Sequence, residues 1–187
     1  GSTNVGPDEN DKRRTCTVEE AVRLGADGVS FHINVGSTYE PDQIPDLAAV
    51  TEEAGRFGMP VLAMAYARGP DIDEHDPEPL GHAVRLAEEL GADVVKTAYS
   101  GDAESFEHVV ESTNRPVIIA GGSPSGDRAS LENVRGAMYA GAAGVSMGRT
   151  VFQHPDPEAM SSAIAAVVHD DEDVDTALRT FDLAADE

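Results

Sequence analysis

Leu90-Gly-Ala-Asp-Val-Val-Lys-Thr-Ala-Tyr-Ser-Gly-Asp102 is a stretch in which a helix end, a buried strand and a lysine follow one another. A glycine directly after a helical pattern is typical of a left-handed C-terminal cap, and the valine run after it predicts a buried strand. The pattern recurs at Leu24-Gly-Ala-Asp27 and at Ala140-Gly-Ala-Ala143, each of which precedes another apolar run. Buried strands that alternate with helices indicate a parallel sheet in an α/β fold.

Hydrophobic periodicity extends this pattern along the chain. The predicted strands are Val29–Ile33, Val61–Tyr66, Val94–Ala98, Val117–Ala120 and Gly144–Met147. The predicted helices are about Pro41–Phe57, Pro77–Leu90, Ala103–Ser112, Ala129–Ala140, Pro157–His169 and Val174–Phe181. Thr17 and Glu20 have the spacing of a capping box, which predicts a further helix that ends near Leu24.

The length allows one domain, which we place over residues 1–187. A closed (β/α)8 barrel has eight β/α units and typically ~250 residues. Periodicity therefore leaves two arrangements open. One is an open doubly wound sheet, and the other is a TIM barrel of which this chain holds only the last five or so β/α units.

Lys96 is one of only two lysines in the chain, the other being Lys12, and it lies inside a predicted strand. Burial disfavours the charged ammonium and can lower its pKa by roughly 3–5 units at the extreme, which produces a neutral amine. A neutral lysine amine attacks ketones to form imines. The competing interpretation is a lysine whose stem lies along the strand end while its charge stays in water.

Glycines and polar residues follow the predicted strands, at the edge where parallel α/β folds place their sites. Tyr66-Ala-Arg-Gly-Pro70 follows the second strand, Gly121-Gly-Ser123 the fourth, and Gly148-Arg149 the fifth. Glycine lets backbone N–H groups approach an anion closely, and a guanidinium can bind phosphate through two hydrogen bonds. The two glycine turns together predict a phosphate site, although either turn alone is also typical of a tight strand exit.

Three side chains near these strand ends have two interpretations each. Tyr66 is either a proton donor or acceptor, or an aromatic residue that ends a strand. Arg68 is either a second phosphate ligand or a surface ion-pair partner. His32 and Asn34 alternate with two apolar residues, so one pair faces the barrel interior and the other the helices. We expect His32 to be a core or site-floor histidine rather than a metal ligand.

Composition limits the partners of this chain. The net charge is −22, from 35 acidic and 13 basic residues, and such a surface repels nucleic acid and anionic membranes. The single cysteine, Cys16, excludes an internal disulfide and a cysteine metal cluster. No run approaches the ~18 apolar residues of a membrane span and no secretory signal is evident, so we expect a cytoplasmic protein.

Motifs along nearly the whole chain resemble the archaeal class I aldolase family. That family includes the fructose-1,6-bisphosphate aldolases and the 2-amino-3,7-dideoxy-D-threo-hept-6-ulosonate synthases. The matching segments are Gly1-Ser-Thr3, Gly6-Pro-Asp-Glu-Asn-Asp-Lys12, Val29-Ser-Phe-His-Ile-Asn-Val-Gly-Ser37, Ala63-Met-Ala-Tyr-Ala-Arg-Gly69, Val95-Lys-Thr-Ala-Tyr-Ser-Gly-Asp102, Ala120-Gly-Gly122, Gly144-Val-Ser-Met-Gly-Arg149 and Val151-Phe-Gln-His154. The His-Ile-Asn-Val-Gly-Ser segment and the Lys-Thr-x-Tyr form are more similar to the synthase branch, so fructose-bisphosphate aldolase is the alternative.

The resemblance implies a TIM barrel and a role for each matching residue. Lys96 would form the Schiff base, and Tyr66 would donate the proton in carbon–carbon cleavage. Tyr66, Ala67 and Arg68 would line the substrate, while Gly121, Gly122, Gly148 and Arg149 would hold its phosphate. The implied partners are a phosphorylated ketose and L-aspartate semialdehyde, on a route to 3-dehydroquinate and the aromatic amino acids. Neither metal nor cofactor is implied, because the iminium is the electron sink, and a homo-oligomer is expected.

The chain departs from the family pattern at two places, and its composition is unusually acidic. The family usually has Tyr-Pro-Arg-Gly where this chain has Tyr66-Ala-Arg-Gly69, and the family's first strands, with an Asp-His-Gly segment, have no counterpart. We therefore expect a partial barrel that is weakly active or inactive alone unless partner chains supply the missing part, or else a non-catalytic sugar-phosphate-binding fragment. The lysine-poor, acid-rich composition resembles that of haloarchaeal proteins, the competing interpretation being an ordinary acidic enzyme.

Overall fold

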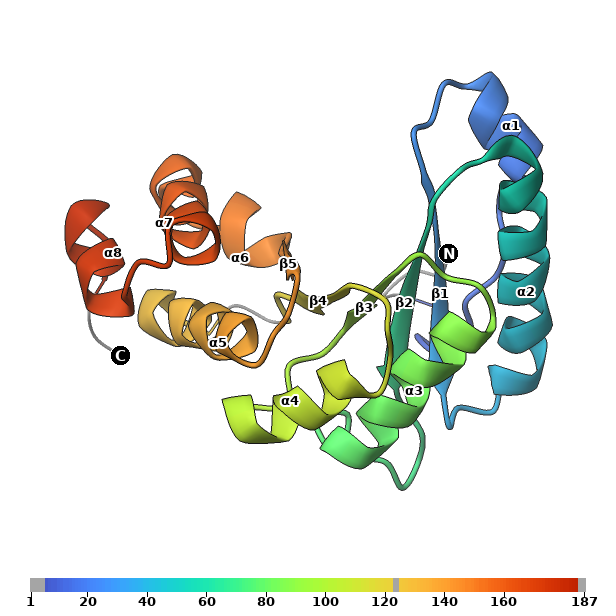
Figure 1. Ribbon diagram of the computed structural model, residues 1–187, viewed down its shortest axis with the longest axis horizontal. Helices are drawn as coiled ribbons and strands as arrows, with labels where there is room; N and C mark the ends of the chain where they lie inside the picture. Colours follow the sequence, from blue (N-terminus) through green and yellow to red (C-terminus); the bar gives the residue numbers. More distant parts are fainter. Residues whose placement is uncertain (1–5, 123–124, 185–187) are drawn as a thin grey trace.

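The strands of the sheet lie side by side in the same order as in the sequence. The structure is a computed structural model that describes residues 6–122 and 125–184. Its strands are β1 (Val29–Val35), β2 (Val61–Ala67), β3 (Val94–Thr97), β4 (Val117–Ala120) and β5 (Gly144–Ser146). All pairs are parallel, in the order β1-β2-β3-β4-β5 (Figure 1). A doubly wound sheet reverses its order at a switch point, so the sequential order selects the barrel arrangement and confirms the predicted partial TIM barrel.

Helices connect the strands and cover one face of the sheet. They are α1 (Val18–Arg23), α2 (Glu40–Phe57), α3 (Pro77–Glu89), α4 (Ala103–Glu111), α5 (Asp127–Tyr139), α6 (Arg149–Phe152), α7 (Pro157–His169) and α8 (Val174–Thr180). In Figure 1, α2 and α3 lie along the sheet, whereas α5, α7 and α8 gather beyond β5. Every predicted helix is present to within about two residues at each end. The short α6 was not predicted, because its four residues carry no period.

The repeated glycines end helices as the sequence predicts. Gly25, Gly91 and Gly141 have positive φ angles of 80°, 93° and 91°, which glycine adopts without steric cost. The capping box at the start of α1 is only half formed. The backbone N–H of Glu20 donates to Thr17 Oγ1 at 3.2 Å, but the Glu20 carboxylate accepts from the Arg23 guanidinium instead of closing the box.

The two faces of the sheet have different partners. Side chains such as Ile33, Ala63 and Val95 pack against the helices and are at most 1% exposed. A second apolar cluster joins α5, α7 and α8, and Met138 and Val145 contact both clusters. The alternate positions, among them His32 and Lys96, lie on the face that corresponds to the interior of a barrel. The alternation predicted for β1 is thereby confirmed, with His32 on the interior side.

Within the described residues, no helix is both long and apolar enough to cross a membrane.

Candidate active site

Lys96 lies in the middle of β3 and its side chain is half-buried on the interior face. Strand register places it level with Met64 on β2 and Ile118 on β4. Its ammonium donates a hydrogen bond to Ser146 Oγ at 3.3 Å, and within the described residues it forms no ion pair. Burial therefore lowers the pKa of Lys96 without a carboxylate to restore it. These conditions favour the neutral amine that attacks a carbonyl.

Tyr66 is the next-to-last residue of β2, lies on the same face and is 8% exposed. Burial raises the pKa of its phenol, with a smaller opposing effect from Arg68. The guanidinium of Arg68 lies over the Tyr66 ring at 4.7 Å from the centroid, and its Nε donates to the Glu74 carboxylate at 3.2 Å. Tyr66 is therefore a protonated phenol at neutral pH. The Arg68 guanidinium packs on its ring, which lies on the interior face of the sheet.

Ala67 has a different position from its neighbours. It is fully buried in the cluster that faces the helices, because successive side chains of a strand point to opposite faces. Its side chain is absent from the lining of the site cavity among the described residues. The structure thus brings Tyr66 and Arg68 to the cavity and directs the side chain of Ala67 away from it.

A cavity of about 690 Å³ opens at the carboxyl ends of β2 to β5. Of the residues predicted for the site, it brings together Tyr66, Arg68, Lys96, Gly121, Gly122, Gly148 and Arg149. A volume of this size is typical of a site for a small phosphorylated molecule. The cavity is where a parallel α/β barrel places its reactive groups.

The two glycine turns are in contact with each other at the far side of this cavity. Arg149 Nη2 donates to the carbonyl of Gly122 at 2.9 Å, which orients the guanidinium beside the turn. A Cβ atom on Gly121 would lie 3.0 Å from Thr150 Oγ1 and 3.1 Å from Met147 Cβ, so the turns leave little room for a side chain there. Gly122 has a φ of 62°. The predicted phosphate turn includes Ser123, which lies outside the described residues.

Several cavity residues were not predicted from the sequence. Ser146 contacts Lys96 although it is fifty residues away in the chain. Glu74 and His75 reach the cavity from the loop after β2, and His75 Nδ1 donates to the carbonyl of Tyr99 at 2.8 Å. Only Ser146 carried a signal, namely its place on the interior side of a predicted strand. The others depend on loop conformation, which hydrophobic periodicity does not describe.

His32 is a neutral imidazole on the same face as Lys96. Its pKa is lowered to about 4 by burial first; the hydrogen bond to Asn34 opposes this, and the nearby cations Lys12, Arg68 and Lys96 lower it further. Its ring lies 5.0 Å from that of Tyr66. Within residues 6–122 and 125–184 no group of three histidine, cysteine or acidic side chains could hold a metal ion. His32 lines a neighbouring cavity beside β1 and meets the site through its contact with Tyr66.

Comparison with known proteins agrees with this geometry. The family profile described as DeoC/LacD family aldolase matches residues 1–154. A Halobacterium salinarum protein named 2-amino-3,7-dideoxy-D-threo-hept-6-ulosonate synthase is 68% identical over 185 residues, which cover 99% of this chain and 70% of the relative. A Streptomyces griseus protein named 2-amino-4,5-dihydroxy-6-oxo-7-(phosphonooxy)heptanoate synthase is 46% identical, with 90% of this chain and 62% of the relative covered.

Among solved structures, a Schiff base-forming fructose-1,6-bisphosphate aldolase superposes with a TM-score of 0.81 at 36% identity, over 84% of this chain and 64% of the other. The chain thus spans about two thirds of the length of these relatives. Its sheet and helices correspond to part of their barrel.

Proposed function

The chain belongs to the DeoC/LacD family of aldolases, and from that premise we propose that it is a lysine Schiff-base transaldolase. Its substrates would be a phosphorylated deoxy-ketohexose and L-aspartate semialdehyde, and its product 2-amino-3,7-dideoxy-D-threo-hept-6-ulosonate, a precursor on a route to 3-dehydroquinate. The 68% identity to a relative named for that product supports this choice. The observation that carries the proposal is Lys96, half-buried without an ion-pair partner among the described residues, in a cavity that also holds Tyr66.

The first step is the formation of an imine on Lys96. The neutral amine attacks the ketone carbon, the carbonyl oxygen takes up two protons in all, and water leaves. The resulting iminium has lost one proton from nitrogen and keeps a positive charge. Ser146, 3.3 Å from Nζ, is placed to accept from the amine and orient its lone pair.

Carbon–carbon cleavage and transfer follow on the same lysine. The bond between the α and β carbons of the iminium breaks, its electron pair forms an enamine, and the β carbon becomes an aldehyde as its hydroxyl loses a proton to solvent. The enamine then adds to the aldehyde carbon of the acceptor, whose oxygen takes a proton from Tyr66. One proton is lost and one gained, and water finally releases the product from Lys96. The high pKa of Tyr66 keeps its phenol protonated for this donation.

The glycine turns would hold the phosphate of the sugar. A side chain at Gly121 would crowd Thr150 and Met147, and Gly122 has a left-handed φ of 62° that favours glycine. Both residues therefore leave backbone exposed, and Arg149 adds a positive charge beside them. A homo-oligomer in the cytoplasm, with residues 1–187 forming one partial-barrel domain, completes the proposal.

Fructose-bisphosphate aldolase is the second candidate, because the 36% identical solved structure shares the fold. It uses the same kind of imine, so only the products separate the two activities. Incubation with each ketose phosphate, with and without L-aspartate semialdehyde, decides between them by chromatography and mass spectrometry.

Borohydride trapping tests the imine itself. The protein is reduced in the presence of a ketose phosphate at high KCl, digested and mapped by mass spectrometry. With only two lysines in the chain, the assignment is unambiguous. A reduced adduct on Lys96 that is absent from a Lys96→Arg variant is the expected result. An adduct on Lys12 alone, or none, would overturn the proposal.

A further inference from the structure

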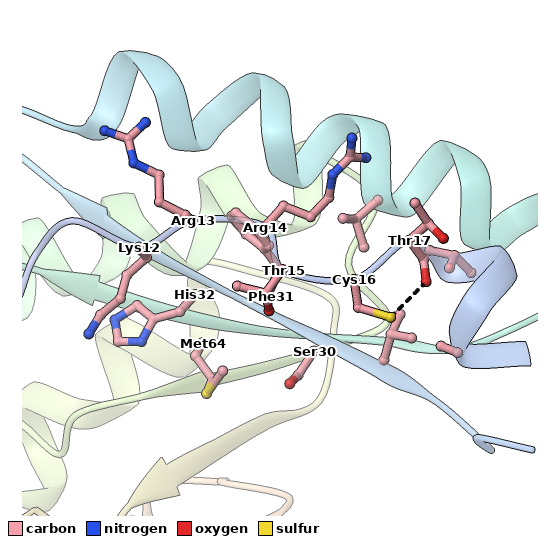
Figure 2. A pocket seen from close by; sticks show the side chains of 14 residues that line it. Lys12, Arg13, Arg14, Thr15, Cys16, Thr17, Ser30, Phe31, His32 and Met64 are labelled. Carbon is pink, nitrogen blue, oxygen red and sulfur yellow. Dashed lines mark hydrogen bonds between the residues drawn. The ribbon is translucent and has the colours of Figure 1, made fainter. Parts of the chain in front are cut away.

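A second cavity, of about 410 Å³, lies beside β1 (Figure 2). Its walls are formed by residues 12–18 on one side and by side chains of β1, including His32, on the other. Figure 2 shows the ammonium of Lys12 next to the His32 ring, whereas the Arg14 side chain extends away towards the neighbouring helix. Of the three consecutive basic residues, Lys12 is therefore the one that approaches the interior face of the sheet.

Buried amides hold Lys12 in this place. The carbonyl of Asn10 accepts from Gln43 Nε2 at 2.6 Å and from Asn34 Nδ2 at 3.2 Å. Asn34 and Gln43 are at most 1% exposed, so the bonds fasten the segment before Lys12 to β1 and α2. A position fixed by buried hydrogen bonds is a prerequisite for a binding group.

The same amides determine the tautomer of His32. Because Asn34 Nδ2 donates to Asn10, its Oδ1 faces His32 and accepts from Nε2 at 2.9 Å. The proton of the neutral imidazole is thus on Nε2, and Nδ1 is a hydrogen-bond acceptor. The low pKa of His32 keeps it in this neutral form at physiological pH.

His32 lies between Lys12 and Lys96, the lysine proposed to form the imine. Register places His32, Met64 and Lys96 at one level on three adjacent strands, so the Cα atoms of His32 and Lys96 are about 10 Å apart. The ring of Tyr66 contacts both His32 and the Arg68 guanidinium. Within the described residues, the side-chain hydrogen bond of Arg68 is donated by its Nε to Glu74, and its Nη groups make none.

Cations gather at this end of the site in a chain of net charge −22. Lys12, Arg68 and Lys96 all lie near enough to His32 to lower its pKa. The pKa of Lys12 is itself lowered by burial first and then by Arg68. Glu9 and Glu74 offset part of this charge. Lys12 lines the cavity beside β1, Arg68 and Lys96 line the larger cavity, and the contact between His32 and Tyr66 joins the two. Several cations that lie close together attract an anion. This region lies over β1 and β2, across Lys96 from the glycine turns that follow β4 and β5.

We propose that Lys12 and Arg68 bind the carboxylate of the acceptor substrate, a short α-amino acid that carries an aldehyde, and that His32 Nδ1 accepts from its ammonium group. The assignment rests on the proposed transaldolase function, because it identifies the substrate that reacts with the enamine. Carboxylate and ammonium are one carbon apart in an α-amino acid, which matches cations placed next to a neutral acceptor. The aldehyde end would then extend over Tyr66 towards Lys96.

The test uses L-homoserine, the alcohol analogue of the acceptor, which binds but cannot react. Its dissociation constant is measured by calorimetry at fixed KCl for the wild type and for Lys12→Met, Lys12→Arg and Arg14→Met. Loss of one charge-assisted contact is expected to weaken binding to Lys12→Met about ten- to a hundredfold. Lys12→Arg keeps the charge and should retain binding to within a fewfold, and Arg14→Met is the matched control for a general loss of charge.

Two further probes identify the group that is bound. L-Homoserine amide lacks the carboxylate and should bind weakly and equally to all four proteins. Inorganic phosphate tests the other source of negative charge. If phosphate binding depends on Lys12 and homoserine binding does not, the carboxylate assignment is wrong. Equal homoserine affinity in the wild type and Lys12→Met, or equal losses in Lys12→Met and Arg14→Met, would also overturn it.

The outcome is separate from that of the imine test. Homoserine binding needs no imine, so it is measurable even if borohydride traps nothing on Lys96. Conversely, Lys12→Met should still give the Lys96 adduct with the ketose phosphate alone. An unchanged melting temperature for Lys12→Met would show that the loss of binding is not a loss of folding.

Discussion

Burial shifts the pKa of Lys96 and that of Tyr66 in opposite directions, and both shifts suit the imine chemistry proposed above. Removing water disfavours the charged form of each group, which is ammonium for lysine and phenolate for tyrosine. The cavity therefore shifts Lys96 towards the neutral amine and Tyr66 towards the protonated phenol. These are the two forms that the proposed mechanism needs, and one physical cause favours both.

Replacement of Tyr66 by phenylalanine separates binding from proton transfer. Tyr66→Phe keeps the ring contacts of His32 and Arg68 but removes the acidic proton. Turnover is expected to fall about 10²–10⁴-fold while the borohydride adduct on Lys96 still forms. Steady-state rates and peptide mapping on the same preparation measure the two effects. An equal loss of turnover and adduct would instead assign Tyr66 to imine formation.

His32 predicts a dependence of stability on pH. Its folded-state pKa of about 4 is below the value of 6.5 for the unfolded chain, so the unfolded state binds more protons between these values. Stability should therefore be lost as the pH falls from about 6.5 to about 4, by up to roughly 3 kcal/mol from this residue. Urea unfolding of the wild type and of His32→Gln across this range measures it. The variant should show a shallower decline, and identical pH profiles would contradict the prediction.

At the scale of elements, the contact between helix α5 and the loop after β3 supports the cavity wall. Tyr99 follows β3, is 9% exposed and packs edge-on against Phe106 of α4 at 5.1 Å between centroids. A Cβ on Gly136 of α5 would lie 2.1 Å from its hydroxyl oxygen. The absence of a side chain at Gly136 is therefore what lets Tyr99 line the site.

Two glycine-to-alanine variants in helix interiors test this contact. Alanine favours a helix by about 1 kcal/mol over glycine, so Gly55→Ala, on the exposed side of α2 with open space around it, should stabilise the protein by up to that amount. Gly136→Ala should instead destabilise by about 1–3 kcal/mol, because Tyr99 must leave its packed position. Denaturant unfolding gives both values. Stabilisation of similar size in both variants would show that Tyr99 moves freely.

Across the whole molecule, negative charge dominates the surface. The excess of 22 negative charges is distributed over a chain whose ion pairs are mostly exposed. Repulsion between such charges opposes the compact state, and salt screens it. The close relative from Halobacterium salinarum fits this chemistry.

Stability should therefore increase with salt. Between 0.2 M and 3 M KCl we expect the melting temperature to rise by more than about 5 °C, as screening shortens the Debye length to a few ångströms. Thermal unfolding followed by circular dichroism measures the change. Sucrose at matched water activity is the control for general exclusion effects. A melting temperature that stays constant or falls with KCl would show that charge repulsion at the surface does not limit the stability.

Short-range features of this protein were predictable from the sequence. The strands, the long helices and the glycine caps at Gly25, Gly91 and Gly141 all follow from periods and turns that span a few residues. Lys96 was identifiable because it is one of two lysines and lies in an apolar run. These properties depend on neighbours within about one turn of helix or strand, so local sequence determines them.

Long-range contacts were decided only by the tertiary structure. Periodicity left the sheet order open, and the pairing of successive strands selected the barrel arrangement. Ser146 meets Lys96 across fifty residues, and Lys12 reaches His32 only because buried amides fasten its segment to β1. The direction of Ala67, away from the cavity, depends on the register of β2. Each of these features depends on packing between elements that are far apart in the sequence. A pattern that spans a few residues therefore does not predict it.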